Sequence, residues 1–193
     1  MMRRGLWIGI AVVVVIFLAV LLVFGSYVSA KNQMVARQEA VRAQWSQVDV
    51  VLQRRSDLIP NLVATVKGYA THEETVFADV ANARSALLSA RDPQSKIAAN
   101  GQLDGAIGRL LVLSENYPNL KADQNFLSLQ DQLEGSENRI AVERRRYNQT
   151  LQDYNTFIRQ FPNSIWAGIA GFQADNAYFQ ASEASKQAPT VKF

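Results

Sequence analysis

The N-terminal apolar run most constrains what this chain can fold into. Leu6 to Phe24 is a stretch of nineteen residues that is apolar throughout apart from Gly9, and no charged residue occurs from Gly5 to Ala30. As a helix, nineteen residues reach about 29 Å, close to the thickness of the hydrocarbon core of a bilayer. The sequence therefore predicts an N-terminal membrane span.

A cleaved signal peptide is the alternative interpretation of this run. Val28 to Ala30, VSA, resembles the small residues that precede a cleavage site. The apolar core of a signal peptide reaches only about 15 residues, however, which is shorter than the run in this chain. We therefore expect a retained anchor.

The charges beside the run bear on its orientation. Arg3 and Arg4 lie on its N-terminal side, whereas Lys31, Arg37 and Arg42 are spread over a longer stretch on the other side. The positive-inside rule then favours a cytoplasmic N-terminus and an extracytoplasmic domain.

The charge balance and the absence of cysteine exclude several classes of site. Arg3 and Arg4 account for two of the 20 Lys and Arg residues, so the rest of the chain is nearly neutral against its 17 Asp and Glu residues. A domain with so small a net charge lacks the basic surface that nucleic-acid binding requires, and we expect no nucleic-acid partner. Without cysteine there are no disulfides, thiol nucleophiles or thiolate metal sites.

After the run, apolar residues recur in steps of three and four, which predicts amphipathic helices. The first stripe skips one position, at Arg55, and contains Pro60, which we expect to kink the helix without ending it because the stripe resumes on the same face. Residues 30–40 hold no Gly or Pro, so this helix is expected to continue almost directly from the span. Its stripe comprises Val41, Trp45, Val48, Leu52, Ile59, Leu62, Val66 and Tyr69.

Local signals predict where the next helices begin. Thr71 and Glu74 in the stretch THEE predict a capping box that opens a second helix. Asp92 followed by Pro93 predicts an N-cap and the first position of a third helix.

The third helix is the one with the weakest intrinsic helicity. It contains Gly101, Gly105 and Gly108, so it must be held by packing or allow close approach of a neighbour. We expect the stretch NYPNLKADQ, residues 116–124, to be a loop and a long fourth helix to follow it until Pro162 stops it.

No segment shows a sustained period of two, so we expect an all-α chain. Four amphipathic helices joined by short polar turns bury their stripes most simply as an antiparallel four-helix bundle. The predicted organisation is a single transmembrane anchor at 1–30, the bundle at 31–162 and an apolar tail at 163–193. That tail is expected to cap the bundle or to contact the membrane or another subunit.

Candidate catalytic and metal-binding residues are few. His72 precedes Glu73, but a zinc-peptidase helix requires His-Glu-x-x-His and Val76 stands in the second histidine's place. We expect His72, the chain's one histidine, to be a surface residue. A carboxylate metal site using residues such as Glu134 and Glu137 remains as an alternative, although Glu-x-x-His pairs of the di-iron bundle enzymes are absent.

The chain resembles the bacterial LemA family over nearly its whole length. The stretches that carry the resemblance are QWSQVDVVLQRRSDLIPNLVATVKGYATHE (44–73), ANARS (81–85), QLDGAIGRLLVLSENYPNLKADQNFLSLQDQLEGSENRIAVERRRYNQTLQDYN (102–155) and the closing PTVKF. The resemblance implies an N-terminal span followed by an antiparallel four-helix bundle. Many members of the family look like lipoproteins with a lipidated cysteine, and this chain departs from them by having none.

The resemblance also implies a set of signature residues with no known catalytic role. They are Arg55, Asp57, Pro60, Asn61, Lys67, Gly68, Tyr69, Tyr147, Asn148, Tyr154, Asn155, Phe161 and Pro162.

Together these inferences predict a non-enzymatic, single-pass interaction or scaffold protein of the bacterial cytoplasmic (inner) membrane. We expect its bundle to be extracytoplasmic, its partners to include the lipid bilayer and a second copy of the chain, and no cofactor or metal to be required. The resemblance suggests an envelope partner such as an HtpX-like membrane metallopeptidase. The alternatives are a carboxylate metal-binding or enzymatic bundle and a lipid-binding module that uses the tail.

Overall fold

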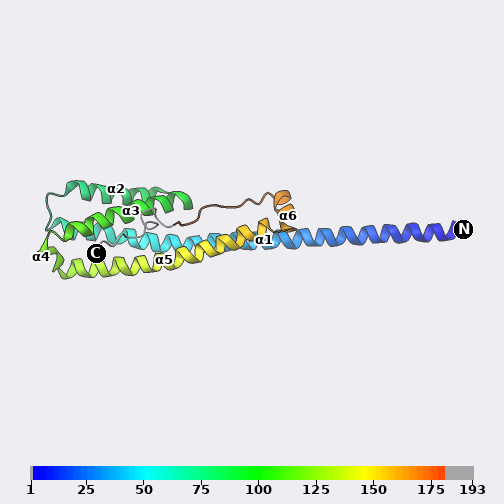
Figure 1. Cartoon of the computed structure of the whole chain (residues 1–193), viewed down its shortest axis with the longest axis horizontal. Coiled ribbons are helices and arrows are strands. Elements are labelled where there is room, and N and C mark those ends of the chain that lie inside the picture. Colours follow the sequence, from blue (N-terminus) through cyan, green and yellow to red (C-terminus); the bar gives the residue numbers. More distant parts are fainter. Residues whose placement is uncertain (1, 181–193) are drawn as a thin grey trace, which may run out of the picture. The chain divides into compact units, whose positions relative to one another are not determined.

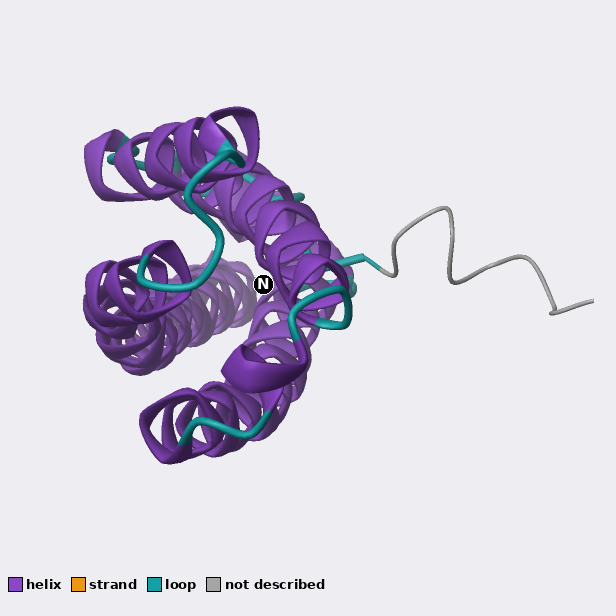
Figure 2. Ribbon diagram, turned by 90° about the vertical axis from the view of Figure 1, so that its left-hand side faces the viewer, coloured by secondary structure: helices purple, strands orange, loops and turns teal. Residues whose placement is uncertain are grey.

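The computed structural model describes the backbone of residues 2–180 and the side chains of residue 7 and residues 9–180. The rest of the predicted tail, with its closing PTVKF, lies outside the described residues. All regular secondary structure in the described range is helical (Figure 2). The all-α prediction is confirmed.

Four long or medium helices and two short ones follow one another along the chain. They are α1 (Met2–Lys67), α2 (Glu74–Ser89), α3 (Pro93–Ser114), α4 (Pro118–Lys121), α5 (Gln124–Arg159) and α6 (Asn163–Ala170). The chain runs in one direction in α1 and α3 and in the opposite direction in α2 and α5, as Figure 1 shows. The predicted antiparallel four-helix bundle is therefore confirmed.

Helix α1 is continuous from Met2 to Lys67, so the apolar run passes into the bundle helix without a break. Its N-terminal part is long and apolar enough to cross a membrane, and none of its most apolar window is buried. Trp7 and Leu22, near the two ends of the run, are 71% and 76% exposed. We refer to the apolar run within α1, residues 6–24, as the candidate span.

The chain forms two compact units, each described by itself. The first consists of residues 2–42 and 150–175, and its buried residues include Ala30, Met34, Leu151, Ile158 and Ala167. The second consists of residues 43–149 and the described part of the segment that begins at Asn176. Tyr69, the last residue of the predicted first stripe, is 41% exposed, but most of that stripe is buried. The core of this unit contains Val48, Leu52, Ile59, Leu62 and Val66 from α1, Phe77, Val80 and Leu87 from α2, Leu103, Ile107 and Leu110 from α3, and Phe126, Leu133, Ile140 and Tyr147 from α5.

Pro60 lies inside α1, and the helix does not end there. A proline has no backbone N–H, so the carbonyl of Ser56, four residues earlier, has no helical donor. The side chain of Arg84 on α2 supplies one, because its Nε donates to the Ser56 oxygen at 2.9 Å. Arg84 lies in the ANARS stretch and Pro60 in the first stretch of the family resemblance, so this bond joins two of those stretches.

The predicted start of α3 is confirmed. Asp92 is its N-cap and accepts the backbone N–H of Ser95 at 2.9 Å, and Pro93 is its first residue. Hydrogen bonds from the Ser95 hydroxyl and backbone lower the pKa of the Asp92 carboxyl below its ordinary value.

Other local predictions are wrong. Helix α2 begins at Glu74 with Glu73 at the N-cap and no side-chain capping bond, so Thr71 and Glu74 form no capping box. The Glu73 carboxylate instead accepts the Tyr117 hydroxyl at 3.2 Å. The predicted loop at 116–124 contains the short helix α4, whose Leu120 is fully buried and fixes the turn in place.

The glycines of α3 do not mark a close helix contact. A Cβ added at Gly101 or Gly108 would meet nothing within 4 Å, and one at Gly105 would meet only the end of the Arg109 side chain at 3.9 Å. The helix is instead held by the packing of its buried face, which includes Leu103, Ile107 and Leu110.

We predict that the cost of removing Arg84 depends on Pro60. Arg84→Met leaves the Ser56 carbonyl without a donor and should lower the free energy of unfolding by about 1–3 kcal/mol. In a Pro60→Ala background, the backbone N–H of residue 60 bonds the same carbonyl, and Arg84→Met should cost much less. Thermal unfolding of the four full-length proteins in mild detergent, followed by circular dichroism, gives the coupling between the two positions. An equal cost of Arg84→Met in both backgrounds would contradict the role assigned to this bond.

Candidate functional site

The skipped position in the first apolar stripe is a core position occupied by arginine. Val48, Leu52, Arg55, Ile59 and Leu62 follow one another in steps of four, three, four and three, so Arg55 falls on the buried face of α1. Its side chain is only 7% exposed. A buried cation must be paired, and the partners of Arg55 define the most polar part of the bundle interior.

Four charged side chains from three helices form what we call the Arg55 cluster. Arg55 on α1 contacts Asp104 on α3 and, through Nη1, the Glu137 Oε2 of α5 at 2.9 Å. Arg144 on α5 approaches the same two carboxylates at 3.5 and 3.7 Å. Asn100 adds a donor, because its Nδ2 bonds Asp104 Oδ2 at 3.0 Å. The cluster is neutral, with two guanidinium groups against two carboxylates.

This geometry leaves the carboxylates committed to arginine. Both Asp104 and Glu137 contact two guanidinium groups, so the oxygens that would serve as a general base or as metal ligands are held by cations. Among the described residues no group of three or more His, Asp or Glu side chains is arranged to hold a metal ion. His72 lies exposed in the turn before α2, as expected.

An aromatic cluster adjoins the charges through Arg144. The Arg144 guanidinium lies over the ring of Phe179, with Cζ 5.1 Å from the ring centroid. Phe179 and Tyr147 meet edge to face at 5.9 Å, and Trp45 lies 5.2 Å from Tyr147 and 6.1 Å from Phe179. Arg144 is only 24% exposed, so it belongs to the bundle interior together with Arg55.

Phe179 belongs to an extended segment, residues 171–180, which we call the strap. Asn148 binds its backbone in both directions, donating from Nδ2 to the Phe179 carbonyl at 2.8 Å and accepting the Phe179 N–H at 3.0 Å. Asn155 does the same for Asp175, at 2.6 and 3.0 Å. An extended segment has no helical partners for its peptide groups, and an asparagine amide supplies one donor and one acceptor together.

Tyr154 adds a third bond to the strap, from its hydroxyl to the carbonyl of Gln173 at 3.0 Å. Burial, and then the negative charge of Asp175, raise the pKa of the Tyr154 phenol, which keeps it protonated as a donor. The signature residues of α5 are thus those that hold the strap.

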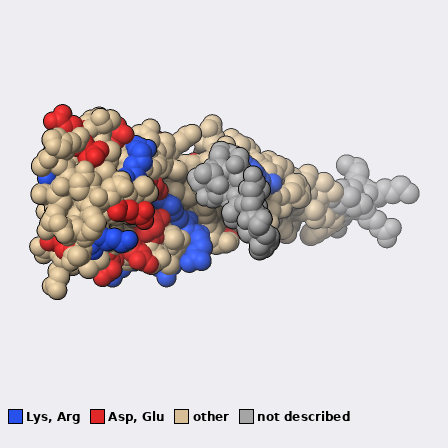
Figure 3. All heavy atoms as spheres, turned by 60° about the vertical axis from the view of Figure 1, so that its left-hand side comes forward, with Lys and Arg blue, Asp and Glu red and all other residues tan. Residues whose placement is uncertain are grey.

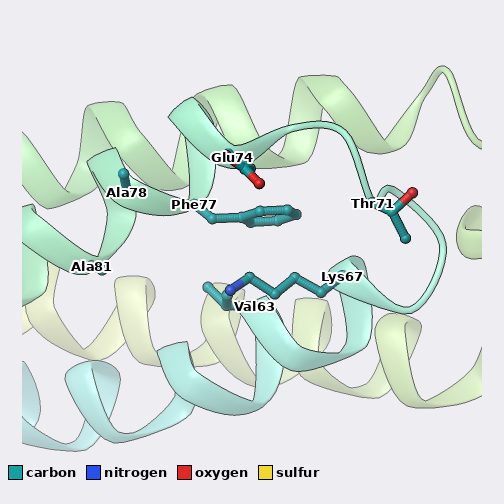
Figure 4. Close-up of a pocket in the computed structure, with 7 residues that line it drawn as sticks. All are labelled: Val63, Lys67, Thr71, Glu74, Phe77, Ala78 and Ala81. Carbon is teal, nitrogen blue, oxygen red and sulfur yellow. The ribbon is translucent and has the colours of Figure 1, made fainter.

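A second set of signature residues lies at the end of α1 beside a groove between α1 and α2. The groove has a volume of about 540 Å³ and is lined by Val63, Lys67, Thr71, Glu74, Phe77, Ala78 and Ala81. In Figure 4 the Phe77 ring lies between the Lys67 and Glu74 side chains, and the Lys67 ammonium is 5.2 Å from the ring centroid. One cation and one anion at the rim of an apolar floor suit a peptide side chain better than a metal ion.

Tyr69, two residues after the groove residue Lys67, stabilises the start of α5. Its hydroxyl donates to Asp123 at 2.9 Å, and Asp123 caps α5 by accepting the Phe126 N–H at 2.9 Å. The backbone hydrogen bond from Phe126, and then the one from Tyr69, lower the pKa of the Asp123 carboxyl. The same bond to Asp123 raises the pKa of the Tyr69 phenol.

The remaining signature residues lie on the surface. Asp57 accepts a hydrogen bond from Gln53 at 2.9 Å, and the carbonyl of Asn61 accepts the Thr65 hydroxyl at 2.9 Å. Phe161 and Pro162 lie between α5 and α6, and Phe161 is 82% exposed. On the bundle face that Figure 3 shows, acidic and basic side chains are interspersed, as the near-neutral charge balance predicts.

We predict an asymmetry in the Arg55 cluster. The double variant Asp104→Asn with Glu137→Gln leaves a buried guanidinium without a carboxylate and should lower the free energy of unfolding by about 3–5 kcal/mol. Arg55→Met leaves carboxylates that are 36% and 42% exposed and still contact Arg144, so it should cost only about 1–2 kcal/mol. Thermal unfolding in detergent measures both. The opposite order would show that burial of Arg55 does not govern this cluster.

Comparison with known proteins supports the resemblance. The model of the LemA family matches residues 44–193. Over 200 residues the chain is 26% identical to Magnetosome protein MamQ 2 of Paramagnetospirillum magneticum, which covers 90% of this chain and 73% of that relative. It is 25% identical over 168 residues to Magnetosome protein MamQ of Magnetospirillum gryphiswaldense, and this match covers 74% of this chain and 62% of that relative. It is 27% identical over 161 residues to Protein LemA of Metamycoplasma hominis, and this match covers 81% of this chain and 72% of that relative. Since the family model matches well over half of its length, this chain belongs to the LemA family.

Proposed function

We propose that this protein is a membrane-anchored, non-enzymatic interaction or scaffold protein of the bacterial cell envelope, which self-assembles or holds a partner at the membrane. The observation that carries the proposal is the continuity of α1, because the same helix contains the exposed apolar candidate span and the first core stripe of the bundle. A bundle built on such a helix cannot leave the membrane without its anchor. Whatever binds the bundle is therefore held at the bilayer.

The use of the charged residues supports a binding role over a catalytic one. The four charged side chains of the Arg55 cluster are paired with one another across helices, so they specify how α1, α3 and α5 fit together. The names of the relatives refer to a family and to the magnetosome and describe no reaction.

The α1–α2 groove is the surface that we propose for a protein partner. It combines an apolar lining with the charged side chains of Lys67 and Glu74, and Lys67 is one of the signature residues. The partner that we favour is a second copy of the chain, and an HtpX-like membrane metallopeptidase remains a proposal from the family resemblance.

We predict that the full-length protein in mild detergent is a defined multimer. Light scattering corrected for bound detergent measures its mass. A monomeric mass would refute self-assembly and leave a heterologous partner, to be sought by crosslinking in intact membranes.

A matched pair of variants tests the groove. Ala78→Trp fills it, whereas Ala98→Trp places the same side chain at an exposed position of α3. The first should reduce assembly and the second should not, with helicity unchanged in both. Equal assembly of the two variants would place the contact elsewhere on the bundle.

We predict that the bundle faces the outside of the cytoplasm. Because the chain has no cysteine, single cysteines report on topology without background. Ser85→Cys, at an exposed position of α2, should react with a membrane-impermeant maleimide in intact cells or spheroplasts, and Met2→Cys should react only after lysis. The reverse pattern would place the bundle in the cytoplasm.

A further inference from the structure

Helix α6 lies beside the candidate span within the first unit. Trp166 of α6 and Tyr27 of α1 meet edge to face with ring centroids 5.6 Å apart. Together with Ile169 they line a groove of about 520 Å³, whose other walls are Ile16, Ala19, Val20, Val23 and Phe24. Every residue of this lining except Tyr27 and Trp166 is purely apolar.

The order of residues along α1 marks the membrane boundary at the level of this groove. The apolar run ends at Phe24, the aromatic Tyr27 follows, and the cation Lys31 comes one helical turn later. Aromatic side chains followed by basic ones are typical of the boundary between hydrocarbon and lipid head groups. Since Trp166 contacts Tyr27, α6 lies at this boundary too.

Two large apolar side chains of α6 are exposed. Ile165 and Ile169, one turn apart on α6, are 50% and 66% exposed, whereas Ala167 is buried. Such exposed apolar residues on a short helix are typical of an element that lies in the membrane interface. The cation Arg159, at the end of α5, is exposed close by in the sequence, where an anionic head group would favour it.

We propose that α6 enters the membrane boundary beside the chain's own span, and that the groove between α6 and Ile16–Tyr27 binds the acyl chain of a bilayer lipid. The groove is continuous with the apolar surface of the candidate span, and a chain-shaped apolar ligand fits its walls because these follow about 16 Å of one helix. The proposal rests on the membrane anchoring proposed above. It adds a second membrane contact and a lipid site to the span.

The three tryptophans of the chain provide the test. Three full-length proteins are prepared, each keeping one tryptophan among Trp7, Trp45 and Trp166 and carrying Trp→Phe at the other two positions. Each is reconstituted into phosphatidylcholine bilayers, with or without bromine on the upper part of the acyl chains, and the bromine quenches only tryptophans that it contacts. Trp7 reports the span, and Trp45 is the protein control because it packs against Tyr147 and Phe179, eighteen residues after Tyr27 in the sequence.

We expect bromine to cause a loss of Trp166 fluorescence comparable to that of Trp7, and no loss for Trp45. Ile169→Asp, which puts a charge into the groove wall, should reduce the loss at Trp166, whereas Ser164→Asp, at an exposed polar position of the same helix outside the groove, should not. Loss at Trp7 without loss at Trp166 beyond that of Trp45 overturns the lipid site and leaves the anchor standing. Absence of loss at both Trp7 and Trp166 overturns the anchor as well.

Discussion

The burial of one guanidinium group is the constraint on which the bundle depends. Arg55 occupies a core position of α1, where a cation without partners would cost several kcal/mol. Its carboxylate partners come from α3 and α5, so those helices must present Asp104 and Glu137 at the same level. An apolar stripe alone tolerates a slip of one turn, whereas a neutral cluster of four charges does not. We therefore attribute the register of α1, α3 and α5 to this cluster.

Arg144 connects that register to the C-terminal strap. The same guanidinium that contacts Asp104 and Glu137 also lies over Phe179, the aromatic anchor of the strap. The backbone of the strap is held by Asn148 and Asn155, which are seven residues apart and so share a face of α5. Side-chain amides thus do for an extended segment what a neighbouring strand does in a sheet.

Periodicity predicted the long helices because their core residues recur in one stripe, and Asp92-Pro93 predicted a helix start because both residues act locally. The Arg55 cluster was not predicted, although the skipped position in the stripe was its signal, since its partners are 49 and 82 residues away. Arg84 donates to the Ser56 carbonyl that Pro60 leaves without a helical donor. In the sequence, the signal for such a donor was the proline inside a helical stripe. The strap has no periodic pattern, because its backbone is held by hydrogen bonds from the side chains of Asn148, Tyr154 and Asn155.

The fixed strap also bears on the exposed residues of α6. A flexible tail with exposed isoleucines would lose little free energy in water, because it could pack these side chains against a nearby apolar surface. Helix α6 has no such freedom, since α5 precedes it and the strap that follows it is bound at Gln173 and Asp175 by Tyr154 and Asn155. In water, Ile165 and Ile169 would then stay solvated at a cost of about 25 cal/mol for each Å² of apolar surface. In the proposed position beside the span, the same rigid placement brings Ile165 and Ile169 into contact with lipid. Their contact with lipid then stabilises the anchored protein.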